Sequence, residues 1–363
     1  MKKGSEEIML MKGNEAIAHA AIRCGCDGYF GYPITPQSEV METLMELEPW
    51  NTTGMVVLQA ESEVASINMV YGAAGCGKKA MTSSSSPGVS LMQEGISYMA
   101  GAELPGVIVN VMRGGPGLGT IQPSQADYFQ AVKGGGHGDY KMPTLAPASV
   151  QEMADLTVLA FDLAFKYLTP TMLLADGIIG QMMEKVVLPP YQPRLTEDEM
   201  RAKYPWATLG KPHGKKPNHI TSLELLSEDM EKLNKRLQAR YRTLEKEEVR
   251  FEEIACEDAD YVFVAFGISA RVCQKAVEIA RSEGIKAGLL RPITLYPFPV
   301  EKIKELSNRV KGFISVELSA GQMVEDVRLA VNGKVPVEFY GRMGGIVPSP
   351  NEVFNALKDK LIQ

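Results

Sequence analysis

The sequence predicts an α/β protein with two domains, and three observations support this prediction. Short apolar segments with strand character alternate with longer segments of helical periodicity along most of the chain, which is typical of parallel sheets covered by helices. A proline-rich, charged stretch from Pro189 to Pro217 interrupts this alternation. The length of 363 residues also exceeds that of a typical single core.

The clearest alternation lies between Met55 and Met99. Its predicted elements are, in order, the strand Met55–Leu58, the helix Val64–Ala74, the strand Ala80–Thr82 and the helix Val89–Met99. In parallel sheets, ligands bind at the carboxyl ends of strands, against helix N-termini. Glu63 and the loop Ser83–Gly88 both fall at such places, so we expect the chemistry of the protein there.

The rest of the first domain continues this pattern. The predicted strands are Glu7–Met11, Tyr29–Tyr32, Gly106–Met112, Thr144–Leu145 and Thr171–Ala175, and the predicted helices are Ala16–Arg23, Pro36–Glu48, Ser124–Val132 and Ser149–Tyr167. Asn14, Thr35 and Ser149 are expected as N-caps, and Pro36 suits a first helical position. Thr35 either binds an anionic group at this helix start or only caps the helix.

Two further residues stand in glycine-rich loops. Arg113 ends a predicted strand and precedes Gly114–Gly119, where a guanidinium could pair with two oxygens of a carboxylate or phosphate. A surface ion pair is the alternative interpretation. His137 lies in the loop Gly134–Asp139 and could donate to a substrate, or it is merely solvated.

The second half of the chain predicts a linker and a second domain. Ser222–Glu253 is rich in charges of alternating sign and predicts one or two exposed helices. Beyond it, the predicted strands are Tyr261–Phe266, Ala287–Leu290 and Phe313–Glu317, and the predicted helices are Ser269–Ser282, Val300–Val310 and Met323–Val331. We therefore divide the chain into a first domain 1–189, a linker with exposed helices 190–257 and a second domain 258–363.

The composition excludes several classes of function. A net charge of -6 argues against non-specific nucleic-acid binding. No apolar run approaches ~20 residues, and acids directly follow the N-terminal lysines, so we expect neither a membrane span nor a signal peptide, but a cytoplasmic protein. The five cysteines and four histidines show no metal-ligand spacing, so we expect no metal site and no iron–sulfur cluster on this chain. Cys24 and Cys26 are either a redox pair or two small buried residues.

Three common motifs are absent or incomplete. Gly72–Lys78 fits most of a phosphate-binding P-loop, but Lys79 replaces the required Ser or Thr, and the glycines end a predicted helix instead of following a strand. Gly115–Gly119 lacks the spacing of a Rossmann dinucleotide site. The chain has no G-x-S-x-G nucleophile elbow. A small anionic substrate beside a polarisable cofactor would suit the remaining set of one acid, one arginine and several hydroxyls.

Several of these segments occur in the order of a known family. They are Tyr32–Pro36, Glu61-Ser62-Glu63 with its Ala/Gly-rich helix, Ser86-Pro87-Gly88, Arg113–Pro116, and Val316-Glu317-Leu318 with Gly321-Gln322-Met323. In this order they resemble the alpha subunit of 2-oxoacid:ferredoxin oxidoreductases. Ser319 or Ala320 stands where the family usually has Asn. The resemblance covers nearly the whole chain and is weakest over 189–253.

The resemblance implies a fold and a reaction. The fold would be a pyrimidine-binding domain of thiamine-diphosphate enzymes followed by a transketolase C-terminal-like domain. The reaction would be oxidative decarboxylation of a 2-oxoacid to an acyl-CoA, with coenzyme A as co-substrate and ferredoxin as electron acceptor.

The resemblance also implies roles for individual residues. Glu63 would hydrogen-bond the aminopyrimidine of thiamine diphosphate as the catalytic acid, with Glu61 as its rival, while Ser85, Ser86 and Gly88 would line the cofactor pocket. Thr35 and Arg113 would hold the substrate carboxylate and keto oxygen, so Arg113 would also be catalytic. His137 or Lys133 could serve a second carboxylate.

The chain also lacks parts that the reaction needs. It has no Gly-Asp-Gly motif followed by Asn for Mg²⁺ and diphosphate, so a beta subunit would share the cofactor. Gamma and ferredoxin-like cluster subunits would complete a dimer of heteromers, with Mg²⁺ and the iron–sulfur clusters on the partners. The loops Gly117–Tyr128 and Gly134–Tyr140 are most similar to the 2-oxoisovalerate type, with the 2-oxoglutarate type second. A non-catalytic scaffold subunit and a free-standing transketolase-like enzyme remain as alternatives.

Overall fold

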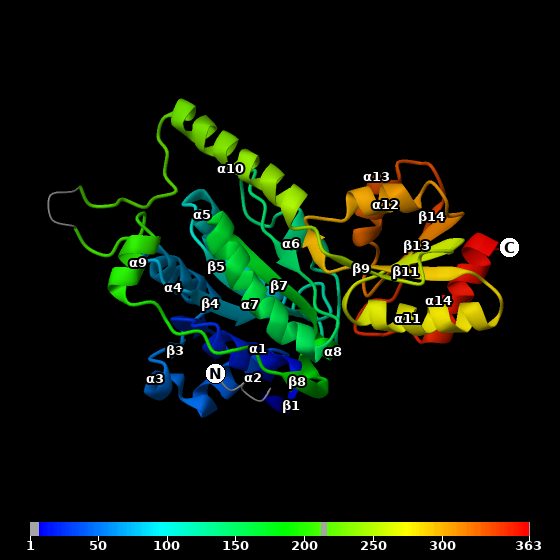
Figure 1. Cartoon of the computed structure of the whole chain (residues 1–363), viewed down its shortest axis with the longest axis horizontal. Helices are drawn as coiled ribbons and strands as arrows, with labels where there is room; N and C mark the ends of the chain where they lie inside the picture. Colours follow the sequence, from blue (N-terminus) through cyan, green and yellow to red (C-terminus); the bar gives the residue numbers. More distant parts are fainter. Residues whose placement is uncertain (1–6, 212–215, 363) are drawn as a thin grey trace, which may run out of the picture.

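The computed structural model describes residues 7–211 and 216–362 and contains two large, mostly parallel sheets that lie side by side, and a small antiparallel sheet formed by β1 and β8 (Figure 1). The strands are β1 (Ile8–Lys12), β2 (Gly28–Gly31), β3 (Val56–Gln59), β4 (Ala80–Ser84), β5 (Gly106–Met112), β6 (Thr144–Leu145), β7 (Pro170–Asp176), β8 (Met183–Val187), β9 (Phe251–Ile254), β10 (Tyr261–Val264), β11 (Ala287–Pro292), β12 (Thr294–Tyr296), β13 (Gly312–Glu317) and β14 (Val337–Gly341). The helices are α1 (Gly13–Arg23), α2 (Ser38–Leu47), α3 (Pro49–Thr52), α4 (Glu63–Gly75), α5 (Pro87–Gly101), α6 (Tyr128–Val132), α7 (Val150–Tyr167), α8 (Gly177–Gln181), α9 (Glu197–Lys203), α10 (Ser227–Glu247), α11 (Gly267–Ser282), α12 (Val300–Leu306), α13 (Met323–Val331) and α14 (Pro350–Leu357), and a π-helical turn, η1, spans Lys358–Ile362.

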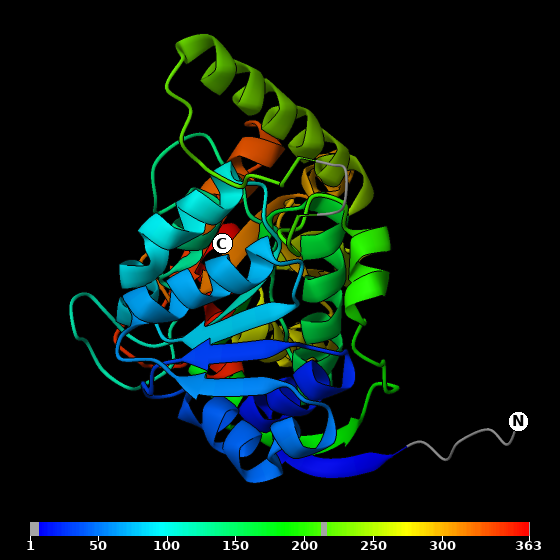
Figure 2. The same ribbon diagram turned by 90° about the vertical axis from the view of Figure 1, so that its left-hand side faces the viewer.

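The first sheet has the strand order β12-β6-β7-β5-β4-β2-β3, and only β12 runs antiparallel to its neighbour. Helices α4 and α5 pack on one face of this sheet, while α1, α2 and α7 pack on the other (Figure 2). Strand β5 is buried along its whole length because helices cover both of its faces. This arrangement brings the carboxyl ends of β4 and β5 next to each other.

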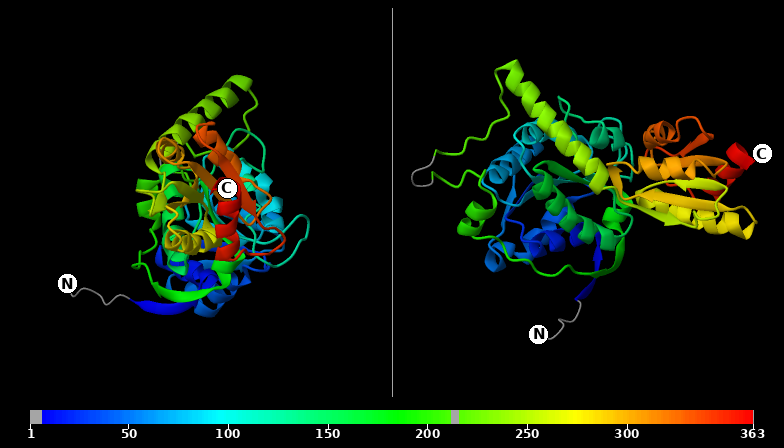
Figure 3. Two further views of the ribbon diagram at one scale, coloured as in Figure 1. Left: turned by 90° about the vertical axis from the view of Figure 1, so that its right-hand side faces the viewer. Right: turned by 45° about the horizontal axis from the view of Figure 1, so that its top comes forward.

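The second sheet has the order β14-β13-β10-β11-β9, and β9 is its antiparallel edge. Helices α11 and α14 cover one face of this sheet. The opposite face belongs to the core that also contains residues of α4 and α5, so the hydrophobic core is continuous from one sheet to the other. The second unit lies beside the first, near the carboxyl end of β7 (Figure 3).

The chain crosses between the two units more than once. Strand β9 precedes residue 258, yet it pairs with β11 of the second sheet. Strand β12 follows β11 but pairs with β6 of the first sheet. The sequence pattern identified neither strand, because both are short and carry no alternation. The division into 1–189, 190–257 and 258–363 stays a prediction.

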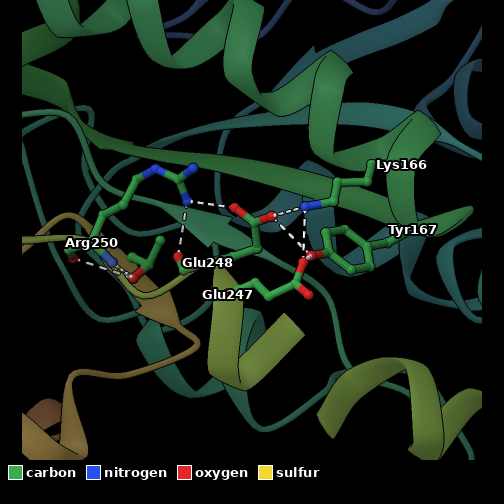
Figure 4. A network of polar contacts seen from close by, with 6 residues as sticks. Lys166, Tyr167, Glu247, Glu248 and Arg250 are labelled. Atoms are coloured by element: carbon green, nitrogen blue, oxygen red, sulfur yellow. Dashed lines mark hydrogen bonds and ion pairs between the residues drawn. The ribbon is translucent and has the colours of Figure 1, made fainter. Parts of the chain in front are cut away.

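The long helix α10 runs across the outside of the first unit (Figure 1). A polar network holds its C-terminal end (Figure 4): Glu248 accepts from Lys166 Nζ at 2.7 Å and from the Tyr167 hydroxyl at 2.8 Å, and it pairs with Arg250 at 2.8 Å. Burial alone would raise the pKa of Glu248, but these donors outweigh it and lower the pKa. The network therefore ties α7, α10 and the entry to β9 together.

Most of the predicted elements are confirmed, and three local predictions are wrong. Helix α2 begins at Ser38 after a cis Thr35–Pro36 bond, so Thr35 is not its N-cap. Asn14 lies inside α1, where its side-chain amide donates to the Pro36 carbonyl at 2.7 Å. The helix predicted over Ser124–Val132 is reduced to α6, because Ser124 and Gln125 bind the backbone of the second unit instead.

Two sequence interpretations are confirmed. Helix α4 ends at Gly75, so the P-loop-like glycines end a helix instead of following a strand. Ser149 caps α7 by accepting the Glu152 backbone N–H at 3.1 Å. None of the helices in 7–211 and 216–362 is long and apolar enough to cross a membrane.

Candidate active site

A cavity of ≈ 630 Å³ lies between the two units, at the carboxyl ends of β4, β5 and β13. Its lining residues are Ser86, Pro87, Ser90, Arg113, Gly115, Pro116, Gly117, Ser124, Ala126, Asp127, Leu318, Ser319, Ala320, Gln322, Met343 and Gly344. Among these described residues, only Arg113 and Asp127 carry a charge. We call this space the interdomain cavity.

Glu63 is the first residue of α4 and lies against the start of α5. Ser62 caps α4 by accepting the Ala65 backbone N–H at 3.2 Å, which leaves the Glu63 carboxyl at the positive end of the helix. The residue is only 6% exposed, and its carboxyl has no hydrogen bond or ion pair within the described part of the chain. An unpaired carboxyl in such a largely buried residue is available for a hydrogen bond with a ligand.

Gly88 makes this placement of Glu63 possible. A Cβ atom added at Gly88 would lie 2.6 Å from Glu63 Oε1 and 2.1 Å from Ser84 Oγ. The absence of a side chain at residue 88 therefore provides the space that the Glu63 carboxyl occupies.

The serine loop between β4 and α5 holds more polar atoms without partners. The hydroxyls of Ser84 and Ser85 are buried, and neither has a hydrogen-bond partner. Ser86 has φ = 21°, an uncommon value for a residue with a side chain, and its backbone N–H donates to Asn110 Oδ1 at 3.0 Å. Buried hydroxyls are normally paired, so these two are unusual, and of this loop Ser86 is the residue that lines the interdomain cavity.

Arg113 is buried at the end of β5, and its guanidinium group makes hydrogen bonds to backbone carbonyls of the same chain. Nη1 donates to the Thr35 carbonyl and Nη2 to the Leu118 carbonyl, both at 3.0 Å. The buried Nε has no partner. The structure therefore brings Arg113 and Thr35 into contact, but this contact uses the backbone carbonyl of Thr35 and not its hydroxyl. The Thr35 residue itself lines a neighbouring cavity of ≈ 740 Å³ beside α2 and α8.

Asp127 is a site residue that the sequence did not single out. It precedes α6, and its Oδ2 accepts from Ser86 Oγ at 2.6 Å and from Asn110 Nδ2 at 2.9 Å. Burial raises the pKa of Asp127, and the two hydrogen bonds act against that effect. In the sequence, Asp127 is an acid directly before a short apolar helix. The predicted helix Ser124–Val132 placed Asp127 inside a helix, so its position at a helix start was missed.

Glu317 shapes the wall that the second unit contributes. It is fully buried at the end of β13 and accepts five hydrogen bonds of 2.9–3.0 Å, from the hydroxyls of Ser315 and Ser319 and from three backbone N–H groups at the start of α13. These bonds fix residues 318–322, which include four that line the interdomain cavity. The Val316-Glu317-Leu318 motif thus has a structural role here.

His137 is not brought to this cavity. It lies near the C-terminal end of α5, where its ring meets that of Tyr98 edge-on at 6.5 Å, whereas the cavity touches the N-terminal end of the same helix. Lys133 pairs with Asp326. The structure thus places His137 beside a different cavity, and its expected contact with the substrate stays a prediction.

The two candidate redox cysteines are both buried and reduced. Burial raises the pKa of the Cys24 thiol to about 12 and also raises the pKa of the Cys26 thiol. A thiol in this state is a poor nucleophile, which favours the interpretation of two small buried residues.

Comparison with known proteins identifies the family. Residues 19–248 match the family model "Pyruvate flavodoxin/ferredoxin oxidoreductase, thiamine diP-bdg", and residues 259–353 match "Pyruvate:ferredoxin oxidoreductase core domain II". The ketoisovalerate oxidoreductase subunit VorB of Methanothermobacter marburgensis is 51% identical over 96% of this chain and 97% of its own length. The chain belongs to the 2-oxoacid:ferredoxin oxidoreductases.

Other relatives place it within this family of oxidoreductases. The 2-oxoglutarate synthase subunit KorA of Archaeoglobus fulgidus is 39% identical over 93% of this chain and 96% of its own length. A solved 2-oxoglutarate:ferredoxin oxidoreductase from Magnetococcus marinus, with 2-oxoglutarate, coenzyme A and succinyl-CoA bound, superposes with a TM-score of 0.85 at 28% identity. The superposition covers 98% of this oxidoreductase subunit and 66% of that longer chain.

The two-domain fold expected for thiamine-diphosphate enzymes is confirmed in this oxidoreductase subunit. Beyond its own family, an inactive split-gene transketolase superposes with a TM-score of 0.61 over 97% of this chain and 98% of its own, at 14% identity. That likeness concerns the fold alone.

Proposed function

We propose that the chain is the alpha subunit of a 2-oxoisovalerate:ferredoxin oxidoreductase, which converts a branched-chain 2-oxoacid and coenzyme A to an acyl-CoA and passes electrons to ferredoxin. The observation that carries the mechanism is the buried, unpaired Glu63 carboxyl beside the free hydroxyls of Ser84 and Ser85. The identity of 51% to a ketoisovalerate oxidoreductase subunit over nearly the whole length supports the choice of substrate.

Thiamine diphosphate fits the residues around Glu63. When bound, it supplies the carbon nucleophile and electron sink that decarboxylation of a 2-oxoacid requires. Glu63 would share a proton with a ring nitrogen of the aminopyrimidine, donating to it as the carboxylic acid and accepting from its N–H as the carboxylate. The serine hydroxyls, including Ser85, are free to hydrogen-bond the cofactor, and Gly88 leaves room for Glu63.

Arg113 would bind the substrate carboxylate. Two of its N–H groups hold the carbonyls of Thr35 and Leu118, which fixes the plane of the guanidinium and leaves Nε and the second N–H of each Nη for a ligand. Thr35 would act beside it by positioning Arg113. A lysine could not hold both carbonyls and a carboxylate in one plane.

A substrate with one carboxylate suits the interdomain cavity. Among the described residues that line it, Arg113 is the single cation, whereas 2-oxoglutarate would need a second one. Lys133 is paired with Asp326, and His137 lies at the other end of α5. This charge count favours the branched-chain acid over 2-oxoglutarate, which is the second candidate.

Partner subunits would complete the enzyme. We propose that a beta subunit supplies the Mg²⁺-diphosphate half of the cofactor site, and that gamma and ferredoxin-like cluster subunits carry the iron–sulfur clusters in a cytoplasmic dimer of heteromers. Support comes from the relatives, which are named as subunits, and from the unpaired polar atoms that this chain leaves around Glu63.

The test is substrate-dependent viologen reduction by the chain assembled with its partners, in the presence of thiamine diphosphate and coenzyme A. We compare 2-oxoisovalerate, 2-oxoglutarate and pyruvate, with wild-type chain and with Glu63→Gln. The expected result is the highest kcat/KM with 2-oxoisovalerate and a loss of at least a hundredfold in the variant.

Other outcomes would contradict specific parts. A preference for 2-oxoglutarate would refute the substrate and keep the mechanism. Full activity in an assembled Glu63→Ala complex would favour a scaffold subunit. Activity of the isolated chain with Mg²⁺ and thiamine diphosphate would favour a free-standing transketolase-like enzyme.

A further inference from the structure

The backbone at Thr35 and Pro36 is held by side chains from three other elements. The Thr35 carbonyl accepts from Arg113 Nη1 at 3.0 Å. The next carbonyl along the chain, that of Pro36, accepts from two amides, which are Asn14 Nδ2 on α1 at 2.7 Å and Gln181 Nε2 on α8 at 2.9 Å. Two successive peptide groups are therefore fixed, and Arg113 is bonded to the first of them.

Glu39, in the first turn of α2, determines how both amides are oriented. Its Oε2 accepts from Asn14 Nδ2 and from Gln181 Nε2, both at 2.9 Å. An amide nitrogen carries two hydrogens, so each amide gives one to the Pro36 carbonyl and the other to Glu39. If either amide turned over, its oxygen would face a carbonyl and a carboxylate, which are both acceptors. The Glu39 carboxylate therefore selects the orientation in which both amides donate.

The surroundings of Glu39 favour its ionised form. Lys12 Nζ forms an ion pair with the other carboxylate oxygen, Oε1, at 3.2 Å. Burial alone would raise the pKa of Glu39, but hydrogen bonds from Gln181, Asn14 and Lys12 outweigh it and lower the pKa. An ionised carboxylate only accepts hydrogen bonds, and this is the form that the two amides need.

Asn14 lies at a close contact between α1 and α8. A Cβ atom added at Gly180 would lie 2.8 Å from Asn14 Oδ1, so this approach requires a glycine at residue 180. Asn14 is fully buried, yet its Oδ1 has no hydrogen-bond partner in the described part of the chain. Because an unpaired buried oxygen costs stability, stability alone does not explain an asparagine at this position. Its two N–H donors do, since they hold Pro36 and Glu39 together.

We propose that Glu39 is a positioning residue that acts through Arg113. It directs the two amides to the Pro36 carbonyl, and this fixes the neighbouring Thr35 carbonyl, which holds one arm of the guanidinium. Glu39 itself lines the cavity beside α2 and α8 and not the interdomain cavity. This inference rests on the proposed function, in which Arg113 binds the substrate carboxylate, and goes beyond it by assigning the residues that support this arginine.

The experiment measures steady-state kinetics of the assembled complex with Glu39→Leu. Leucine accepts no hydrogen bond, so the two amides are free to turn and the backbone at Thr35 can move. We expect KM for the 2-oxoacid to rise about tenfold, while KM for coenzyme A and the affinity for thiamine diphosphate change less than twofold. A loss of folded protein would instead lower kcat and leave KM unchanged. Glu39→Gln keeps an acceptor oxygen and should recover most of the lost affinity.

Glu42→Leu is the matched control for Glu39→Leu. Glu42 lies on the same helix and lines the same cavity beside α2 and α8. It is exposed, however, and has no hydrogen bond or ion pair with any residue that the structure describes. Its replacement should therefore leave all kinetic constants unchanged.

A double variant tests whether the effect passes through Arg113. In an Arg113→Lys background, the guanidinium that Glu39 would position is absent. Glu39→Leu should then change KM for the 2-oxoacid less than twofold, although it changes this KM about tenfold in the wild-type background. Equal effects in the two backgrounds would overturn the inference, because Glu39 would then act by another route.

Gln181→Met tests the same network from a different helix. It removes one of the two donors to the Pro36 carbonyl, so KM for the 2-oxoacid should rise several-fold with kcat maintained. An unchanged KM in both Glu39→Leu and Gln181→Met, in a complex whose wild type is active, would overturn the inference and leave the proposed function intact. An assembled wild-type complex that oxidises no 2-oxoacid would instead overturn the proposed function.

Discussion

Replacing Gly88 by alanine tests the central contact of the site. The added Cβ would lie 2.1 Å from Ser84 Oγ and 2.6 Å from Glu63 Oε1, distances that real Cβ atoms do not show. The unpaired Ser84 hydroxyl can rotate away, but the clash with Glu63 Oε1 then remains, so the Glu63 carboxyl must shift as well. Displacing it by about 1 Å from its ligand should reduce kcat by about a hundredfold. Strain in the packed site should cost about 1–3 kcal/mol of unfolding free energy.

A matched glycine separates this clash from the general effect of alanine in a helix. Gly72 lies in α4, is exposed, and has no atom within 4 Å of an added Cβ. Gly72→Ala should therefore stabilise the chain by roughly 0.5–1 kcal/mol and leave activity unchanged.

The assay combines urea unfolding of both variants, thiamine diphosphate calorimetry on the assembled complex, and viologen reduction. The reasoning predicts opposite signs of the stability change for the two variants, with a loss of kcat for Gly88→Ala alone. If Gly88→Ala were as stable and as active as Gly72→Ala, the proposed dependence of Glu63 on the space at residue 88 would be refuted.

Three further predictions follow from individual contacts. Arg113→Lys should raise KM for the 2-oxoacid at least tenfold, since a single ammonium cannot hold the carbonyls of Thr35 and Leu118 and a carboxylate together. Steady-state kinetics, with Arg271→Lys as the control, measures this effect. An unchanged KM would show that Arg113 does not bind the substrate. Burial raises the pKa of Asp176 to about 6, whereas the unfolded state has the usual pKa of about 3.9, so the folded state binds this proton more tightly. The stability that results is complete below pH ~4 and is lost as pH rises through 6. In urea unfolding, the contribution of Asp176 to the free energy of unfolding should be about 1 kcal/mol smaller at pH 7 than at pH 5, and Asp176→Asn should abolish this difference. Ser149→Ala should lower the free energy of unfolding by about 1 kcal/mol through loss of the α7 cap, whereas Ser149→Asp should keep it; equal stability of all three chains would contradict the capping role.

The regular part of the fold could be predicted from the sequence. Buried parallel strands read as continuous apolar runs, so β5 and β7 were recognisable, and strong caps such as Ser149 marked helix starts. The short strands β9 and β12 could not be found, because their positions depend on pairing with distant strands rather than on local pattern. The start of α2 was misplaced because tertiary contacts of Pro36 and Asn14 determine it.

The candidate site was only partly predictable for the same reason. Glu63, Arg113 and the serine loop follow strands of one sheet, so topology alone placed them at one edge. Asp127 was missed because its significance comes from Ser86 and Asn110, which are distant in sequence. The position of His137 near the C-terminal end of α5 could not be predicted, because a loop histidine gives no sign of which end of a distant helix it approaches.

Strand β12, which follows β11 of the second sheet but pairs in the first sheet, has a mechanical consequence. Because β12 is hydrogen-bonded to β6, the second unit cannot rotate away from the first without tearing this strand from the sheet. The bidentate pair of Arg291 with Glu152 and the bond from Ile268 to Asp176 would have to break in the same motion. These bonds therefore resist any change in the separation of the two walls of the interdomain cavity, so a ligand that binds there meets a site whose width is set before binding.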